Sequence, residues 1–378
     1  MRGSGYTHMF ASPYFTALAQ KISALGGYFN GHLHLGRVNT WDDSYLARDD
    51  VQISGASHLS LQEKHALITK LHASSAYTRA DYLRRISEGT DVLIGCGTAR
   101  ADTVVDVTDD GLELQALGWM MEHADAVKDK MILRAASYNP MGFRDDAPRR
   151  WALFEEGAQH SDFIGALPEK DDRDDYPDHI GYDESCARVL DLARRLGKMV
   201  QVHTDQRNDP REAGTERLLD MIERDGIVAG DDLGGPMVWA VHMISPSAYD
   251  PARWDRLVER LLACRVGVVV APSAALGMRQ LRGLSAPTHN SIARVLDLAA
   301  AGVPIRLGSD NVCDMLSPSS TLDLMSEIFC LTAALRFYDQ DILAKLATGT
   351  PLDDADRATI ADHLAEDAKE AQRIVDRG

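Results

Sequence analysis

The chain has 378 residues, a length that fits either one (β/α)8 barrel or two smaller domains. Its 40 lysine and arginine residues against 57 acidic residues give a net charge of −17, and this acidic balance excludes nucleic acid as a partner. With 45% hydrophobic and 26% charged residues, the composition is that of a globular protein with a large core and excludes a disordered chain.

The cysteines indicate a reducing compartment. They are odd in number and form no CxxC pair, so we predict neither a disulfide framework nor a thiolate zinc site. No run reaches the roughly 20 apolar residues that span a bilayer, and no signal peptide opens the chain. We therefore expect a cytoplasmic protein without a membrane partner. Residues 1–9 are interpreted as an expression leader, followed by a single domain over residues 10–378.

Eight short apolar runs rich in β-branched residues are predicted to be buried strands. In chain order they are Gly27–His34, Asp91–Thr98, Met131–Tyr138, Asp162–Pro168, Lys198–His203, Pro236–His242, Val266–Pro272 and Val303–Asp310. Their near-continuous hydrophobicity is typical of parallel strands covered on both faces. Amphipathic stretches with helical spacing lie between them, at Asp183–Leu196, Glu212–Arg224, Pro251–Cys264 and Asn290–Ala301. Eight βα units in succession predict a closed (β/α)8 TIM barrel.

Two insertions interrupt the repeat, Trp41–Ala73 after the first strand and the acidic Glu169–Asp183 after the fourth. We expect both to be loops over the mouth of the barrel. Beyond the last strand, Thr321–Phe337 and Ala355–Val375 are predicted to be closing helices. Neither end of the chain supplies enough strands for a second sheet, so we predict a barrel without a β-sandwich domain.

Polar residues at the ends of the predicted strands carry the functional signal. His32 and His34 close the first strand, His203 the fifth, His242 the sixth and Asp310 the eighth. Chemistry in such barrels occurs at the strands' C-terminal ends, and residues i and i+2 of a strand point to the same side. These side chains are therefore expected to meet around one metal ion. The alternative is a set of separate capping or surface histidines, the role expected for His58, His65, His72, His123 and His363.

This layout resembles the amidohydrolase superfamily, and within it the cytosine deaminase-like branch. The matching segments are His32-Leu-His34, Ile164–Pro168, Val202–Gln206, Val241–Met243 and Leu307–Asp310. The resemblance implies that one divalent ion, zinc or iron, is bound by His32, His34, His203 and Asp310. It also implies that His242 assists catalysis or binds a second ion.

The chemistry implied by the resemblance is hydrolysis of a carbon–nitrogen bond. An ion in such a ligand set lowers the pKa of water towards about 7 and so provides hydroxide at neutral pH. Asp310 would accept the proton of the water, and a protonated His242 would stabilise the oxyanion that develops.

Three positions depart from that branch. Gln206 stands where the branch carries a proton-shuttling glutamate, and Asn311 stands where it carries a second aspartate. The segment Ser137–Gly142 has no clear equivalent of the glutamine that reads a pyrimidine edge. Because an amide does not exchange a proton at neutral pH, we predict cleavage of an amide or cyclic amide, with Gln206 and Asn311 hydrogen-bonding a small polar heterocycle. The first alternative is deamination of an amino-heterocycle. A metal-dependent lyase or isomerase and a non-enzymatic binding barrel are further alternatives.

The end of the fourth strand leaves a second ion open. Glu169 or Lys170 stands where two-metal members of the superfamily place a bridging carboxylate or a carboxylated lysine, beside His203 and His242. The competing interpretation of this segment is a solvated run of charges.

Four more residues are predicted to contact the substrate. Arg279 and Arg282 lie after the seventh strand, where they could clamp a substrate carboxylate, and Trp41 and Tyr138 are candidate pocket walls. The identity of the substrate and the oligomeric state, including a homo-oligomer, stay open.

Overall fold

The computed structural model describes residues 12–46, 59–278 and 292–377, and its strands form one closed barrel. Eight parallel strands pair in chain order from β1 to β8, and a parallel bridge between Leu33 and Asp310 joins the first strand to the last. The strands are β1 Tyr28–Leu33, β2 Thr98–Asp106, β3 Ile132–Tyr138, β4 Phe163–Ala166, β5 Val200–Thr204, β6 Val238–His242, β7 Val266–Val270 and β8 Ile305–Leu307. The predicted TIM barrel is confirmed, and every strand of the described residues belongs to this sheet.

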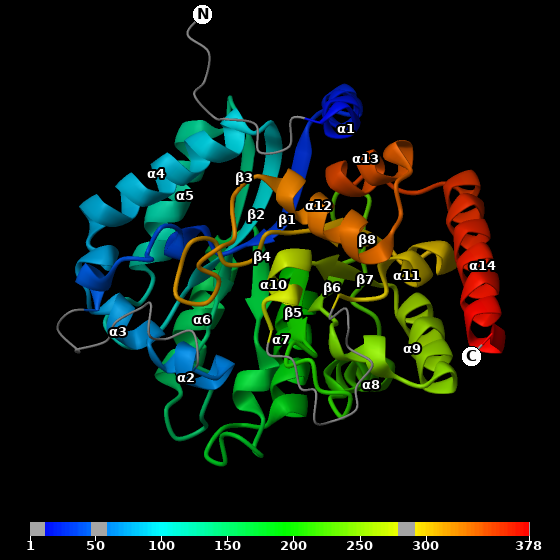
Figure 1. The fold of residues 1–378 in the computed structure, drawn as a ribbon. Helices are drawn as coiled ribbons and strands as arrows, with labels where there is room; N and C mark the ends of the chain where they lie inside the picture. Colours follow the sequence, from blue (N-terminus) through cyan, green and yellow to red (C-terminus); the bar gives the residue numbers. More distant parts are fainter. Residues whose placement is uncertain (1–11, 47–58, 279–291, 378) are drawn as a thin grey trace, which may run out of the picture.

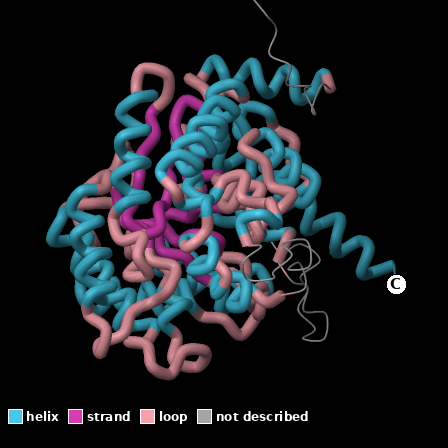
Figure 2. Tube along the Cα trace, turned by 90° about the vertical axis from the view of Figure 1, so that its left-hand side faces the viewer, coloured by secondary structure: helices cyan, strands magenta, loops and turns pink. Residues whose placement is uncertain are grey.

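Helices surround the strands (Figures 1 and 2). They are α1 Pro13–Ala24, α2 Leu61–Ala66, α3 Ile68–His72, α4 Arg79–Gly95, α5 Gln115–Val127, α6 Arg149–His160, α7 Tyr182–Leu196, α8 Gly214–Asp225, α9 Pro251–Ala263, α10 Pro272–Leu276, α11 Val295–Ala301, α12 Leu324–Leu335, α13 Gln340–Thr348 and α14 Asp354–Arg377. Short 3₁₀ turns are η1 Leu35–Arg37, η2 Asp43–Tyr45, η5 Ser75–Tyr77, η6 Pro168–Asp171 and η7 Ser245–Ala248. In the described part of the chain, no helix combines the length and the apolar character that crossing a bilayer requires.

Local sequence explains why these elements form. All residues of β7 are buried, as its run of valines between two layers requires. In α7 the apolar residues recur at helical spacing and are buried, while acidic residues occupy its first turn and basic residues its last. The helix ends at Leu196, and the Gly197 that follows has a φ of 61°, the left-handed conformation that glycine adopts without steric cost.

The second predicted strand is wrong. Residues 91–95 form the last turns of α4, where Leu93 is buried, and the strand begins only at Thr98. A short apolar run is compatible with either element, and here the helix continues through it. The sequence pattern did not indicate β2 because the first half of this strand carries Arg100 and Asp102, charged residues that form an ion pair. Helix α13, between the two predicted closing helices, was also missed.

The N-terminal end of the barrel is closed by ion pairs. Arg134 on β3 approaches Asp102 to 2.6 Å and Asp232 to 2.7 Å, and Arg306 on β8 lies within 4.0 Å of Asp102. A layer of apolar side chains that includes Trp239 lies in the barrel interior. The candidate functional site therefore lies at the opposite end of the barrel, where the strands terminate.

Candidate metal centre

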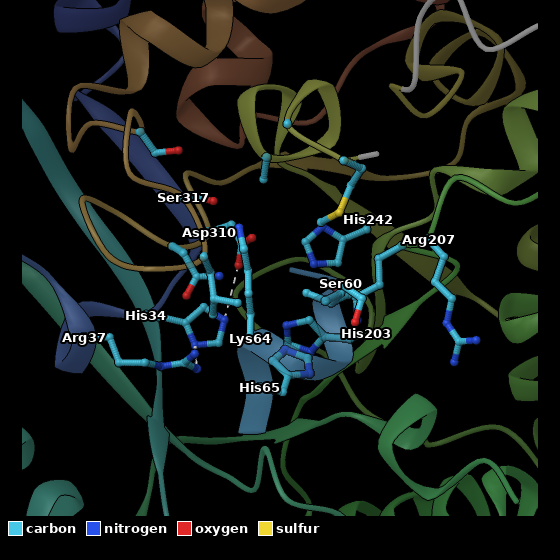
Figure 3. Close-up of a pocket in the computed structure, with 18 of the residues that line it drawn as sticks. His34, Arg37, Ser60, Lys64, His65, His203, Arg207, His242, Asp310 and Ser317 are labelled. Carbon is cyan, nitrogen blue, oxygen red and sulfur yellow. Dashed lines mark hydrogen bonds and ion pairs between the residues drawn. The ribbon is translucent and has the colours of Figure 1, made fainter. Parts of the chain in front are cut away.

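Four side chains meet at the C-terminal mouth of the barrel. The potential ligand atoms of His32, His34, His203 and Asp310 all lie within 4.8 Å of one another, and all four residues are buried. Nε2 of His34 lies 3.2 Å from Oδ1 of Asp310, and Nε2 of His32 lies 3.6 Å from the same oxygen. Figure 3 shows His34 and Asp310 turned towards each other, with His203 nearby. The structure thus brings together the residues that the strand-end pattern predicts to meet.

The backbone is strained where two of the site residues leave their strands. His242 has a φ of 80° and Asp310 a φ of 57°, in the left-handed region that residues with a Cβ rarely adopt. Such conformations cost about 1–3 kcal/mol each and persist where the surrounding structure enforces them.

Hydrogen bonds determine which nitrogen of two histidines faces the site. Gln201 donates its amide NH₂ to the carbonyl of Gly31 at 2.8 Å, so its Oε1, 2.6 Å from Nδ1 of His32, accepts the proton of that ring. Nδ1 of His203 donates in the same way to the carbonyl of Ala166 at 2.9 Å. Both Nε2 atoms therefore present lone pairs to the site.

The donor set fits a divalent ion such as zinc. Nε2 of His32, Nε2 of His203 and Oδ1 of Asp310 are buried without a hydrogen-bond partner among the described residues. Burial lowers the pKa of His34 to about 3 and that of His203 well below its usual value, so both rings are neutral, as ligands must be. Burial would raise the pKa of Asp310, but the neighbouring histidines outweigh burial and hold the pKa well below its usual value, so the carboxylate is ionised. Three imidazoles and one carboxylate are ligands that zinc commonly takes.

The third histidine is held differently. Arg37 donates from Nη2 to Nδ1 of His34 at 2.5 Å, so the neutral ring carries its proton on Nε2 and would have to release that proton to bind an ion through this atom. Arg37 is itself paired with Asp106 at 3.3 Å, and Nε2 of His72 lies 3.1 Å from the same carboxylate. Nδ1 of His72 lies 2.7 Å from Asp110. The insertion helix α3 is thereby connected to a candidate ligand.

His242 corrects one expectation. Its ring centroid lies 5.3 Å from that of His203, at the edge of the site. Burial lowers the pKa of His242 to about 4, so the imidazole is neutral at pH 7 and not the protonated group expected from the sequence. A neutral ring still offers one N–H donor to an oxyanion.

A cavity of about 570 Å³ opens beside the four residues. The barrel contributes to its wall, among others, Tyr138, Gln206, His242, Asn311 and Met278. Trp41, a predicted pocket wall, does not line the cavity; it is 36% exposed, and its backbone amide donates to the carbonyl of Cys313 at 3.0 Å. Arg279 and Arg282, the predicted carboxylate clamp, lie outside the described residues, as do His58 and the leader at 1–9.

The first insertion was expected to be a loop over the mouth. It does reach the mouth, but it carries the helices α2 and α3, and its His65 is not the capping or surface histidine that was expected. Leu61, Lys64 and His65 of α2 line the cavity, at the i, i+3 and i+4 positions of one helix face. Burial lowers the pKa of His65 to about 3, with Lys170 and Arg37 reinforcing the effect. The Ser60-x-x-Glu63 capping box is a sequence signal that could have indicated the start of α2, but it does not indicate that one face of the helix lines the cavity.

The start of the acidic insertion is buried. Glu169 and Lys170 are 9% and 8% exposed, so these two residues are not part of a solvated charge run. Glu169 accepts a hydrogen bond from Nε2 of Gln206 at 2.8 Å, and Lys170 donates to the hydroxyl of Tyr176 at 2.9 Å. Neither residue joins the ligand cluster within the described ranges, which contain one such cluster at this mouth.

Comparison with known proteins agrees with this architecture. No protein-family profile matches the chain. An uncharacterized protein of Haemophilus influenzae is 27% identical over 277 residues, which are 73% of this chain and 92% of that protein. The structure of 5-methylcytosine deaminase from Klebsiella pneumoniae with phosphonocytosine has a TM-score of 0.71 at 22% identity, covering 89% of this chain and 75% of that one.

A second solved structure shows the same likeness. N-isopropylammelide isopropylaminohydrolase from Burkholderia multivorans has a TM-score of 0.60 at 18% identity, covering 88% of this chain and 74% of that one. At these identities the likeness establishes a shared fold, in agreement with the predicted (β/α)8 barrel.

Proposed function

We propose that this protein is a metal-dependent hydrolase of the amidohydrolase superfamily that cleaves an amide-type carbon–nitrogen bond in a small polar heterocycle. The observation that carries the proposal is the convergence of His32, His34, His203 and Asp310 within 4.8 Å at the mouth of a barrel. The adjoining cavity of about 570 Å³ has room for a small molecule.

The residues of the chain have separate tasks in this reaction. A divalent ion held by the four residues would supply hydroxide at neutral pH by lowering the pKa of water. The ionised Asp310 would accept the proton of the water and return it to the departing nitrogen. The neutral His242 would donate its N–H to the developing oxyanion. Gln206 lines the cavity, where it would bind and orient the substrate.

Metal content tests the first half of the proposal. We expect elemental analysis to find about one zinc or iron per chain, because three imidazoles and a carboxylate complete one site. His203→Asn should remove the metal, whereas His363→Asn, on the distant helix α14, should retain it. Full activity in a metal-free preparation would contradict the proposal.

Labelled water tests the reaction. In H₂¹⁸O, purified enzyme acting on a panel of cyclic amides and amino-heterocycles should place ¹⁸O in the product, which a lyase or isomerase does not require. We expect Gln206→Glu to leave the native activity equal or lower. Because a missing general acid lowers a rate by about 10²–10⁴-fold, a large gain in ammonia release from an amino-heterocycle would instead identify a deaminase.

A further inference from the structure

The amide of Gln206 has one defined orientation. Its Nε2 donates to Oε2 of Glu169 at 2.8 Å, and its backbone N–H donates to Oε1 of the same carboxylate at 3.4 Å. Glu169 is 9% exposed and does not line the main cavity, whereas Gln206 does. The side of the amide that remains for the cavity is its carbonyl oxygen, which has no hydrogen-bond partner in the described parts of the chain.

The carboxylate of Glu169 is what selects this orientation. An ionised carboxylate only accepts hydrogen bonds, so it can face the NH₂ group of Gln206 but not its carbonyl oxygen. Burial raises the pKa of Glu169 to about 7, against the lowering effect of Arg207, so the group is ionised at pH 8. An amide without this neighbour could turn over and present NH₂ instead.

A second amide of the pocket also offers an acceptor. Asn311 lines the cavity, and its Oδ1 is buried without a hydrogen-bond partner among the described residues. A buried acceptor that stays unpaired is costly, so a ligand that supplies a donor is favoured over one that does not. Gln206 and Asn311 together make the pocket rich in acceptors.

We propose that Glu169 is a positioning residue that holds the carbonyl oxygen of Gln206 towards the substrate, so that the site selects rings presenting an N–H. This inference rests on the proposed function and narrows its substrate class to cyclic amides, imides and ureides in their N–H form. A ring with a bare nitrogen at that position, as in an amino-pyrimidine, would place two acceptors against each other and is rejected.

Binding of small imides tests the inference without a known substrate. The probes are succinimide and N-methylsuccinimide, and glutarimide and N-methylglutarimide, titrated by calorimetry into the zinc-loaded protein at pH 8. We expect the N–H form of at least one pair to bind about 10-fold more tightly, because the methyl group removes the donor. Where a probe is turned over, the ratio of KM values replaces the ratio of dissociation constants.

Three variants separate positioning from packing. Glu169→Gln should reduce the preference to about 2-fold or less, since the amide of Gln206 is then free to turn. Glu327→Gln is the matched control, because this buried carboxylate accepts from the hydroxyl of Ser273 at 2.6 Å and makes no hydrogen bond to Gln206. The exchanged pair, Glu169→Gln with Gln206→Glu, should restore the preference, because the group at the pocket again only accepts.

The outcomes are distinct. An unchanged preference in Glu169→Gln, in protein whose melting temperature shows that it is folded, would overturn the inference, as would a wild type that binds neither N–H probe. A preserved preference in a protein that hydrolyses no compound of the panel would contradict the proposed function alone.

Discussion

His72 illustrates how a single residue connects the insertion to the site. It is 8% exposed, and its two ring nitrogens lie 3.1 Å from Asp106 and 2.7 Å from Asp110. The ring of Tyr77 lies 4.6 Å away, and Arg37 shares Asp106. Burial by itself would lower the pKa of His72, but the hydrogen bonds to the two aspartates outweigh it and raise the pKa above its usual value.

We expect His72→Gln to destabilise the protein in a pH-dependent way. A raised pKa in the folded state means that the stabilisation is complete below the unfolded value of about 6.5 and is lost as the pH rises through the folded value. Urea denaturation should show a loss of about 1.5–3 kcal/mol at pH 6 and a smaller loss at pH 9. His363→Gln serves as control, and a loss that grows with pH would contradict this assignment.

At the scale of elements, the short helix α2 presents part of the cavity wall. Ser60 accepts from the backbone of Glu63 at 3.2 Å, and Glu63 accepts from the backbone of Ser60 at 2.7 Å. A helix of six residues has little stability of its own, so these caps contribute much of what keeps Lys64 and His65 at the mouth.

Glu63→Ala should loosen α2 without weakening the barrel. Loss of one capping interaction of about 0.5–1 kcal/mol corresponds to about 2–5-fold faster amide hydrogen exchange in residues 61–66. Mass spectrometry of exchange should show this change there and none in β5 and β6. Glu88→Ala, at an exposed position of α4, should leave the exchange of α2 as it is. Equal acceleration throughout the chain would show that the caps support the whole fold instead.

For the whole molecule, the two ends of the barrel have different roles. The N-terminal end holds Asp102, which is fully buried, between the arginines of β2 and β3, while the candidate ligands lie at the other end. A substitution at the N-terminal end should therefore change the stability of the protein without changing metal binding at the other end.

Asp102→Asn should lower stability and spare the metal site. It removes the buried negative charge that pairs with Arg100 and Arg134, and breaking a buried ion pair costs about 3–5 kcal/mol. Denaturant titration should show this loss while elemental analysis finds unchanged zinc. Asp341→Asn, which breaks the exposed contact with Lys21, should change the unfolding free energy by less than about 1 kcal/mol. Loss of zinc in folded Asp102→Asn protein would contradict the separation.

Local sequence patterns were sufficient to predict the barrel and the cluster of four potential metal ligands. A covered parallel strand appears as an apolar run, and His32, His34, His203 and Asp310 stand where such runs end, so chain position alone predicts that they meet. The second strand escaped this logic because its inward residues are charged and are matched by partners on other strands.

Contacts between distant segments decided the parts of the site that sequence patterns did not predict. His65 lines the cavity and His72 is buried because α2 and α3 fold back over the barrel, which no spacing within residues 59–73 encodes. The orientation of the Gln206 amide is likewise not encoded locally, because the carboxylate to which it donates is 37 residues away in the chain. Which neighbour a polar group finds depends on how loops from different strands pack together, and that packing exists only once the barrel has closed.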